Sequence, residues 1–154
     1  MEGQVNGSFT YPVAAGQLRK GGYVMIDGNP CKIVKITIHK TGKHGHAKAR
    51  VTGVDLFGSA KREDIYSTSH SVDVPVIERQ ELSLVDIEDD SDNLILMGTD
   101  GSFREDLDAP HGKLGEDLRA AFSALNEDSE ELLCTVISAL GKERIVAYRV
   151  GREG

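Results

Sequence analysis

Short segments in which apolar and polar residues alternate begin at residue 21 and continue to the end of the chain. Such alternation is typical of β-strands that have one buried face. In the first half the predicted strands lie at residues 23–26, 31–39 and 49–58, with a further strand pair within 59–75. The strands at 31–39 and 49–58 are joined by a glycine-containing segment, which predicts a β-hairpin with a long loop.

The second half has the same alternation, interrupted by one helical pattern. Its predicted strands lie at residues 81–87, 91–97, 103–106, 131–140 and 144–150. Between them, Leu118, Ala121, Phe122 and Leu125 follow the spacing of one helix face, which predicts a helix over 115–127. Glu116 and Asp117 favour its N-terminal end through the helix dipole.

The single proline at position 75 stands between two apolar β-type segments, and we place a domain boundary there. Residues 1–15 are small and polar with little periodicity, which predicts a flexible N-terminal tail. The predicted organisation is therefore a tail (1–15), a first domain (16–75) and a second domain (76–154). Many short strands with one short helix predict an all-β fold of two small barrels.

Charge divides the chain at the same point. Residues 1–74 hold ten Lys and Arg against six Asp and Glu, a balance of +4, whereas residues 75–154 have a balance of −11. The net charge is −7. An asymmetry of this kind predicts two units with different surfaces, of which the first suits a polyanion.

Cys31 and Cys134 lie far apart within apolar segments, which predicts buried free thiols rather than a disulfide or a metal site. No apolar run approaches the length of a membrane span. The N-terminal residues resemble no signal peptide. We therefore expect a soluble, cytoplasmic protein without a membrane span. No nucleophile–base pair or paired carboxylates can be identified from spacing, so we expect no catalytic residues and no enzyme.

The most unusual segment is "KTGKHGHAK", residues 40–48, which holds three lysines, two histidines and no acid. Gly42 and Gly45 permit a tight turn, so Lys43 is expected at the apex of the hairpin. A phosphate-binding P-loop is excluded because no Ser or Thr and no helix follow. A metal site at His44 and His46 is disfavoured because no third ligand lies nearby. A solvated loop tip and a nucleic-acid contact both remain, and the absence of acids throughout residues 29–54 favours the second.

The same segment resembles a known family. Together with "VTGVDLF", "REDI", "DVP", "REDL" and "LGEDL", it is similar to the hypusine-bearing translation initiation factor 5A family of eukaryotes and archaea. The resemblance extends from about Gln17 to Val150. It implies an N-terminal SH3-like barrel that carries the hypusine loop, followed by an OB-fold domain with one short helix.

The lysine of "TGKHG" that the family modifies corresponds to Lys43. The resemblance implies that deoxyhypusine synthase transfers an aminobutyl group from spermidine to Lys43, and that deoxyhypusine hydroxylase completes hypusine in eukaryotes. No other cofactor and no metal are implied. The implied loop around the modified residue comprises Lys40, Thr41, Gly42, His44, Gly45 and His46.

The implied function is that of a factor that binds the ribosome near its exit site, in contact with ribosomal RNA. There the modified arm positions the acceptor end of peptidyl-tRNA, which promotes elongation through stalling sequences such as proline runs, and termination. The alternative is a general RNA-binding protein without a specific ribosomal role. Further candidates for contact with RNA phosphates are Lys48, Arg50, Lys61 and Arg62.

Two features depart from a simple RNA-binding pattern. Residues 36–39 read "ITIH" where the family commonly has small hydroxyl residues, which affects the expected contacts of the modifying enzyme. The second half is acidic and has only Phe103, Phe122 and Tyr148 as aromatic residues. It is therefore expected to be a poor stand-alone binder of oligonucleotides. Its acids either hold off RNA and fix orientation, or form a plain soluble surface.

Overall fold

The computed structural model describes residues 9–40 and 47–152. Within these residues the chain divides into two compact units. The first runs to Val76 and includes Ala139–Lys142, and the second begins at Ile77 and holds the rest. Most of the described residues lie in antiparallel strands, with one short α-helix among them, as the sequence pattern predicts.

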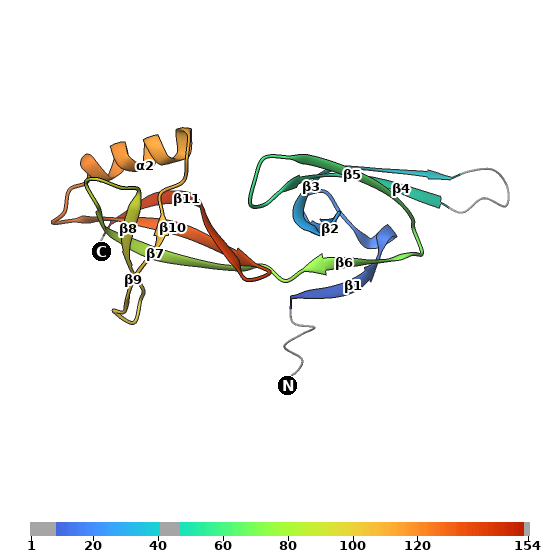
Figure 1. The fold of residues 1–154 in the computed structure, drawn as a ribbon, viewed down its shortest axis with the longest axis horizontal. Helices are drawn as coiled ribbons and strands as arrows, with labels where there is room; N and C mark the ends of the chain where they lie inside the picture. Colours follow the sequence, from blue (N-terminus) through green and yellow to red (C-terminus); the bar gives the residue numbers. More distant parts are fainter. Residues whose placement is uncertain (1–8, 41–46, 153–154) are drawn as a thin grey trace. The chain divides into compact units, whose positions relative to one another are not determined.

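The first unit contains a four-stranded antiparallel sheet and a two-stranded one. The larger sheet has the order β2-β3-β4-β5, and the smaller pairs β1 with β6 (Figure 1). The strands are β1 (Thr10–Ala14), β2 (Tyr23–Ile26), β3 (Asn29–Lys40), β4 (Ala47–Asp55), β5 (Lys61–Ser67) and β6 (Ser71–Pro75). Its core is built from the buried faces of these strands, with Val24, Ile26, Cys31, Ile33 and Val51 almost fully enclosed.

The second unit contains a five-stranded sheet in the order β11-β10-β7-β8-β9. Its elements are β7 (Glu78–Ile87), β8 (Asn93–Met97), β9 (Phe103–Asp108), α2 (Lys113–Ser123), β10 (Glu130–Ala139) and β11 (Lys142–Arg152). Figure 1 shows α2, in orange, beside the strands of this sheet. Leu118 on α2 is fully buried among the leucines and valines of the strands, so the helix closes the core of this unit.

The prediction of a flexible tail is wrong for residues 10–15. Thr10–Ala14 form β1, which pairs with β6 over its whole length, and a 3₁₀ turn follows at Ala15–Gln17. Ala15 is only 1% exposed. Pairing with β6 orders this segment, and Val13 and Ala15 pack against the core.

Two further expectations need correction in detail. The strands predicted within 59–75 exist as β5 and β6, but β5 pairs with β4 and β6 pairs with β1, so they are not partners of each other. The helix begins at Lys113 and ends at Ser123, earlier than the predicted end at 127. Leu125 follows the helix and still packs against the core, which explains why the apolar spacing extended past the helix.

Candidate nucleic-acid interface

The hairpin of β3 and β4 carries the predicted site at one end. The strands remain paired from Cys31 and Asp55 as far as Lys40 and Ala47. The predicted loop residues Thr41, Gly42, Lys43, His44, Gly45 and His46 lie outside the described residues. The structure therefore describes the two strands that lead to the predicted loop, and the expected position of Lys43 stays a prediction.

Basic residues gather on one face of this hairpin. They stand at alternate positions of β3 and β4, and alternate residues of a strand share a face. The register places His39 opposite Lys48, Thr37 opposite Arg50 and Lys35 opposite Thr52. The intervening residues, such as Ile36 and Val51, belong to the other face, where Val51 is fully buried in the core. The basic residues of this outer face are all exposed, namely Lys35, His39, Lys48 and Arg50.

Arg50 is not a free cation on this face. Its Nη2 donates to Glu63 Oε1 at 2.9 Å, and Thr52 Oγ1 donates to Glu63 Oε2 at 3.2 Å. The hydrogen bond from Arg50 holds the pKa of Glu63 below its usual value, and the charge of Lys35 acts in the same direction. Strands β3, β4 and β5 form a surface pocket of about 310 Å³ around this contact. It is lined by Lys35, Thr37, His39, Arg50, Thr52 and Glu63.

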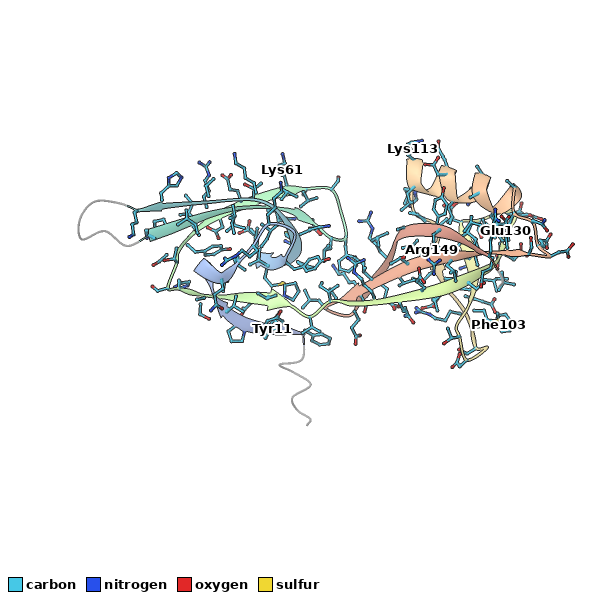
Figure 2. The ribbon with its side chains drawn as sticks, turned by 180° about the vertical axis from the view of Figure 1, so that it is seen from behind. Tyr11, Lys61, Phe103, Lys113, Glu130 and Arg149 are labelled. Carbon is cyan, nitrogen blue, oxygen red and sulfur yellow. The ribbon has the colours of Figure 1, made fainter. Side chains whose placement is uncertain are left out.

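Lys61 and Arg62 lie at the far end of β5. The register places Lys61 opposite Val54 and Arg62 opposite Gly53, whereas Lys48 lies opposite Ser67. Six residues along a strand separate Lys48 from Val54, or about 20 Å. The Lys61 side chain is exposed on β5 (Figure 2). By the same alternation, Lys61 lies on the face that carries Lys48 and Arg50, at the far end from Lys48, whereas Arg62 belongs to the opposite face.

Arg62 has a structural partner. Its Nη2 contacts Asp55 Oδ2 at 3.4 Å, and the side chains are 29% and 12% exposed. Asp55 also accepts a hydrogen bond from the backbone N–H of Phe57, which fixes the turn after β4. The Arg62 guanidinium is therefore partly buried against the turn that follows β4.

Four residues of this pocket were not predicted from the sequence: Lys35, Thr37, Thr52 and Glu63. The first two could have been found, because they alternate with buried residues on a strand that already contained the candidate His39. Thr52 alternates with Arg50 and could have been found in the same way. Glu63 could not, because its position beside Arg50 depends on the register of β4 and β5, which the sequence does not state.

The second unit offers a different surface. Several of its cations are held by carboxylates: Arg104 by Asp106 and Glu143, Arg119 by Asp92, Arg149 by Glu81, and Lys113 by Asp117. Phe122 and Tyr148 pack against the core, whereas Phe103 is 60% exposed. Two of the three aromatic residues are thus partly buried against the core, which limits their stacking on bases.

The described parts of the chain contain neither a metal-binding cluster nor a membrane-spanning helix. Residues 9–40 and 47–152 contain no cluster of three or more His, Cys, Asp or Glu side chains that could hold a metal ion. The same residues contain no helix long and apolar enough to cross a membrane. Both cysteines are free and fully buried, which confirms the prediction made for them.

Two family models match the chain, and together they span most of it. Residues 8–70 match the model described as "Translation initiation factor 5A-like, N-terminal". Residues 76–149 match the model described as "Eukaryotic elongation factor 5A hypusine, DNA-binding OB fold".

Relatives and solved structures agree with these models. The chain is 47% identical to eukaryotic translation initiation factor 5A of Drosophila melanogaster, over 92% of this chain and 86% of that protein. It is 42% identical to eukaryotic translation initiation factor 5A-1 of Saccharomyces cerevisiae, over 92% and 87%.

Among solved structures, the 5A family protein of Naegleria fowleri has a TM-score of 0.78 at 45% identity, covering 92% of this chain and 99% of that one. The 5A factor of Methanococcus jannaschii has a TM-score of 0.71 at 34% identity, covering 91% and 95%. These matches confirm the predicted fold class, an all-β N-terminal barrel followed by an OB fold with one helix.

Proposed function

Because the chain belongs to the translation initiation factor 5A family, we propose that it acts on the ribosome through a hypusine formed at Lys43. It binds near the exit site, in contact with ribosomal RNA, and positions the acceptor end of peptidyl-tRNA. In this way it promotes elongation through stalling sequences such as proline runs, and termination. The supporting observation is the "TGKHG" motif in the connection between β3 and β4, beside a cationic strand face.

The modified lysine supplies reach and a second amine. Deoxyhypusine synthase transfers the aminobutyl group of spermidine to Lys43, and deoxyhypusine hydroxylase then adds a hydroxyl group. The resulting arm carries two amines and can enter a space that the barrel cannot. By holding an anionic RNA end in one orientation, it converts a loosely held reactant into a positioned one. The factor performs no bond chemistry in this proposal.

The strands beside the loop supply the remaining contacts. His39 and Lys48 lie opposite each other near the end of the hairpin. Lys40 follows on the other face of β3, and all three are exposed. Side chains of this kind bind phosphates and sugars without reading sequence, which suits a factor that acts on every message. His44 and His46 in the loop add to these contacts. The acidic second unit repels RNA and so favours one orientation of approach.

A general RNA-binding role is the second candidate, favoured only by the cationic face itself. The two candidates differ in what they bind in a cell extract at physiological salt. The proposed function requires co-sedimentation with ribosomes, whereas a general binder would distribute onto free messenger RNA.

The decisive experiment replaces Lys43 by Arg. Arginine keeps the positive charge and most of the stem but cannot accept the aminobutyl group. With both modifying enzymes and spermidine present, we expect Lys43→Arg to bind ribosomes weakly and to leave ribosomes stalled on a proline-run message. The melting temperature should not change, because a polar, glycine-flanked segment contributes little to stability.

The matched control is Lys40→Arg, the same exchange at the end of β3, which should retain activity. Full rescue of stalled ribosomes by Lys43→Arg would end the long-arm proposal for this protein.

A further inference from the structure

The pocket on the outer face of β3, β4 and β5 is built from groups that bind anions. Lys35, His39 and Arg50 contribute cationic or protonatable nitrogens, and Thr37 and Thr52 contribute hydroxyl groups. Among the described residues that line this pocket, Glu63 is the one carboxylate. Outside the lining, Lys48 on β4 and Lys61 on β5 lie on the same face as the pocket.

Glu63 occupies the place in this pocket that an external anion would take. One carboxylate oxygen accepts a hydrogen bond from Arg50 and the other accepts one from Thr52. Phosphate oxygens accept hydrogen bonds from the same kinds of donor, a guanidinium and a hydroxyl group. The protein's own carboxylate thus satisfies donors that are arranged for an oxyanion.

The internal pair is weak enough to be exchanged. The side chains of Arg50 and Glu63 are 56% and 46% exposed, so water screens their attraction. Glu63 lies on β5, which is the edge strand of its sheet, so no further strand covers it on that side. Arg50 can then present two parallel N–H groups to a phosphate.

RNA backbone is the anion that fits the surroundings. Alternate residues on a strand repeat about every 7 Å, which is close to the distance between neighbouring phosphates of one strand. Lys35, Thr37 and His39 on β3 therefore lie along a line that leads toward the loop, with Arg50 and Lys48 beside them. A small anion held alone would need a buried site, whereas Arg50 and Glu63 in this pocket are 56% and 46% exposed.

We propose that this pocket binds one backbone phosphate of RNA, and that Glu63 competes with that phosphate for Arg50 and so limits the affinity. The inference rests on the proposed ribosomal function for the biological source of the RNA. It adds a second contact point, distinct from Lys43, and assigns Glu63 as the residue that sets the strength of that contact.

The test compares Glu63→Gln with Asp64→Asn in the full chain. Both changes remove one negative charge from adjacent exposed residues of β5, but Asp64 belongs to the opposite face and does not line the pocket. Binding to a short fluorescent RNA stem-loop is measured by anisotropy at low salt. We expect Glu63→Gln to raise the affinity about fivefold, since an exposed pair is lost and Arg50 is released, and Asp64→Asn to raise it less than about twofold.

A second comparison tests whether the gain in RNA affinity depends on Arg50. Glu63→Gln is repeated in an Arg50→Gln background, where its effect should fall to that of Asp64→Asn. Equal effects of Glu63→Gln and Asp64→Asn, or an undiminished effect without Arg50, would overturn the inference. Because unmodified protein is used, these results are independent of Lys43. A negative result for Glu63→Gln therefore does not bear on the role of Lys43. A negative result in the stalling assay likewise does not bear on the role of Glu63.

Discussion

Arg104 on β9 binds two carboxylates at once and illustrates how single residues organise the second unit. Its Nε and Nη2 donate to the two oxygens of Asp106 at 3.0 and 2.8 Å. Its Nη1 and Nη2 also donate to Glu143 at 3.1 and 2.6 Å. Because Glu143 lies on β11, this one guanidinium ties the two edge strands of the five-stranded sheet together. Its charge is thus used within the protein and is not offered to RNA.

The pairing of Arg104 with Asp106 predicts a contribution to stability that is lost at acid pH. The hydrogen bonds from Arg104 hold the pKa of Asp106 below its ordinary value of 3.8. A lowered folded-state pKa stabilises the protein above the ordinary value, and the stabilisation is lost as pH falls through the folded-state value. We therefore expect Arg104→Gln to lower the free energy of unfolding at neutral pH by less than about 1 kcal/mol, since Asp106 is mostly exposed and water screens the pair.

The difference between Arg104→Gln and the wild type should shrink below pH 3.8. Urea unfolding followed by circular dichroism at a series of pH values measures this. Arg152→Gln, the same exchange at an exposed residue near the end of β11, serves as the control and should show no such trend. A difference that stayed constant from neutral to acid pH would show that Arg104 acts through packing instead of through charge.

At the scale of elements, α2 depends on a close approach that only glycine allows. Gly115 is buried in the first turn, and a Cβ added there would overlap the carbonyl oxygen of Pro110. The helix itself would gain from alanine, which has the higher intrinsic propensity by about 1 kcal/mol. The clash involves backbone atoms that cannot rotate away, so it outweighs this gain.

We expect Gly115→Ala to lower the free energy of unfolding by about 3 kcal/mol, as overpacked sites do. Thermal and urea unfolding measure it. Gly58→Ala is the matched control, because a Cβ there would meet no atom closer than the Asp55 side chain at 3.8 Å. Its stability should stay near that of the wild type. A Gly115→Ala protein as stable as the wild type would mean that α2 shifts without loss of packing.

Strands with one fully buried face are predicted from the sequence more easily than short strands or contacts between strands. The strands β3 and β4 were predicted because one face of each is buried, so Ile33 and Val51 are fully enclosed and their neighbours are not. Strand β1 was missed because it is short and its sequence, TYPVA, has no clear alternation of apolar and polar residues. The Arg50–Glu63 contact was missed because pairing between strands is a property of the fold, which a local pattern does not contain.

At the scale of the whole molecule, the two halves of the chain differ more in net charge than in secondary structure. Both halves are antiparallel and mostly β, but the first carries +4 and the second −11. In the second half many cations are already bound to acids, whereas Lys48 on β4 is exposed on a face with few carboxylates. Ribosome binding should therefore depend on where a charge lies and not only on the total.

The comparison of Lys48→Glu with Lys113→Glu tests this, because both reverse one exposed lysine and give the same net charge. Lys48 lies beside the β3–β4 loop, whereas Lys113 lies on α2, is 86% exposed and faces Asp117. Co-sedimentation with ribosomes over a range of salt concentrations is the measurement. We expect Lys48→Glu to weaken binding about tenfold or more at low salt and to reduce the salt slope by about one unit, as loss of one phosphate contact does.

Lys113→Glu should change ribosome affinity by less than about twofold. Its melting temperature must be checked as well, because a second acid beside Asp117 is mildly unfavourable on a helix. If both variants lost affinity equally and with the same salt slope, binding would follow the net charge of −7 alone. The contacts would then not lie on the β3–β4 face, and the polarised surface would have no role in docking on the ribosome.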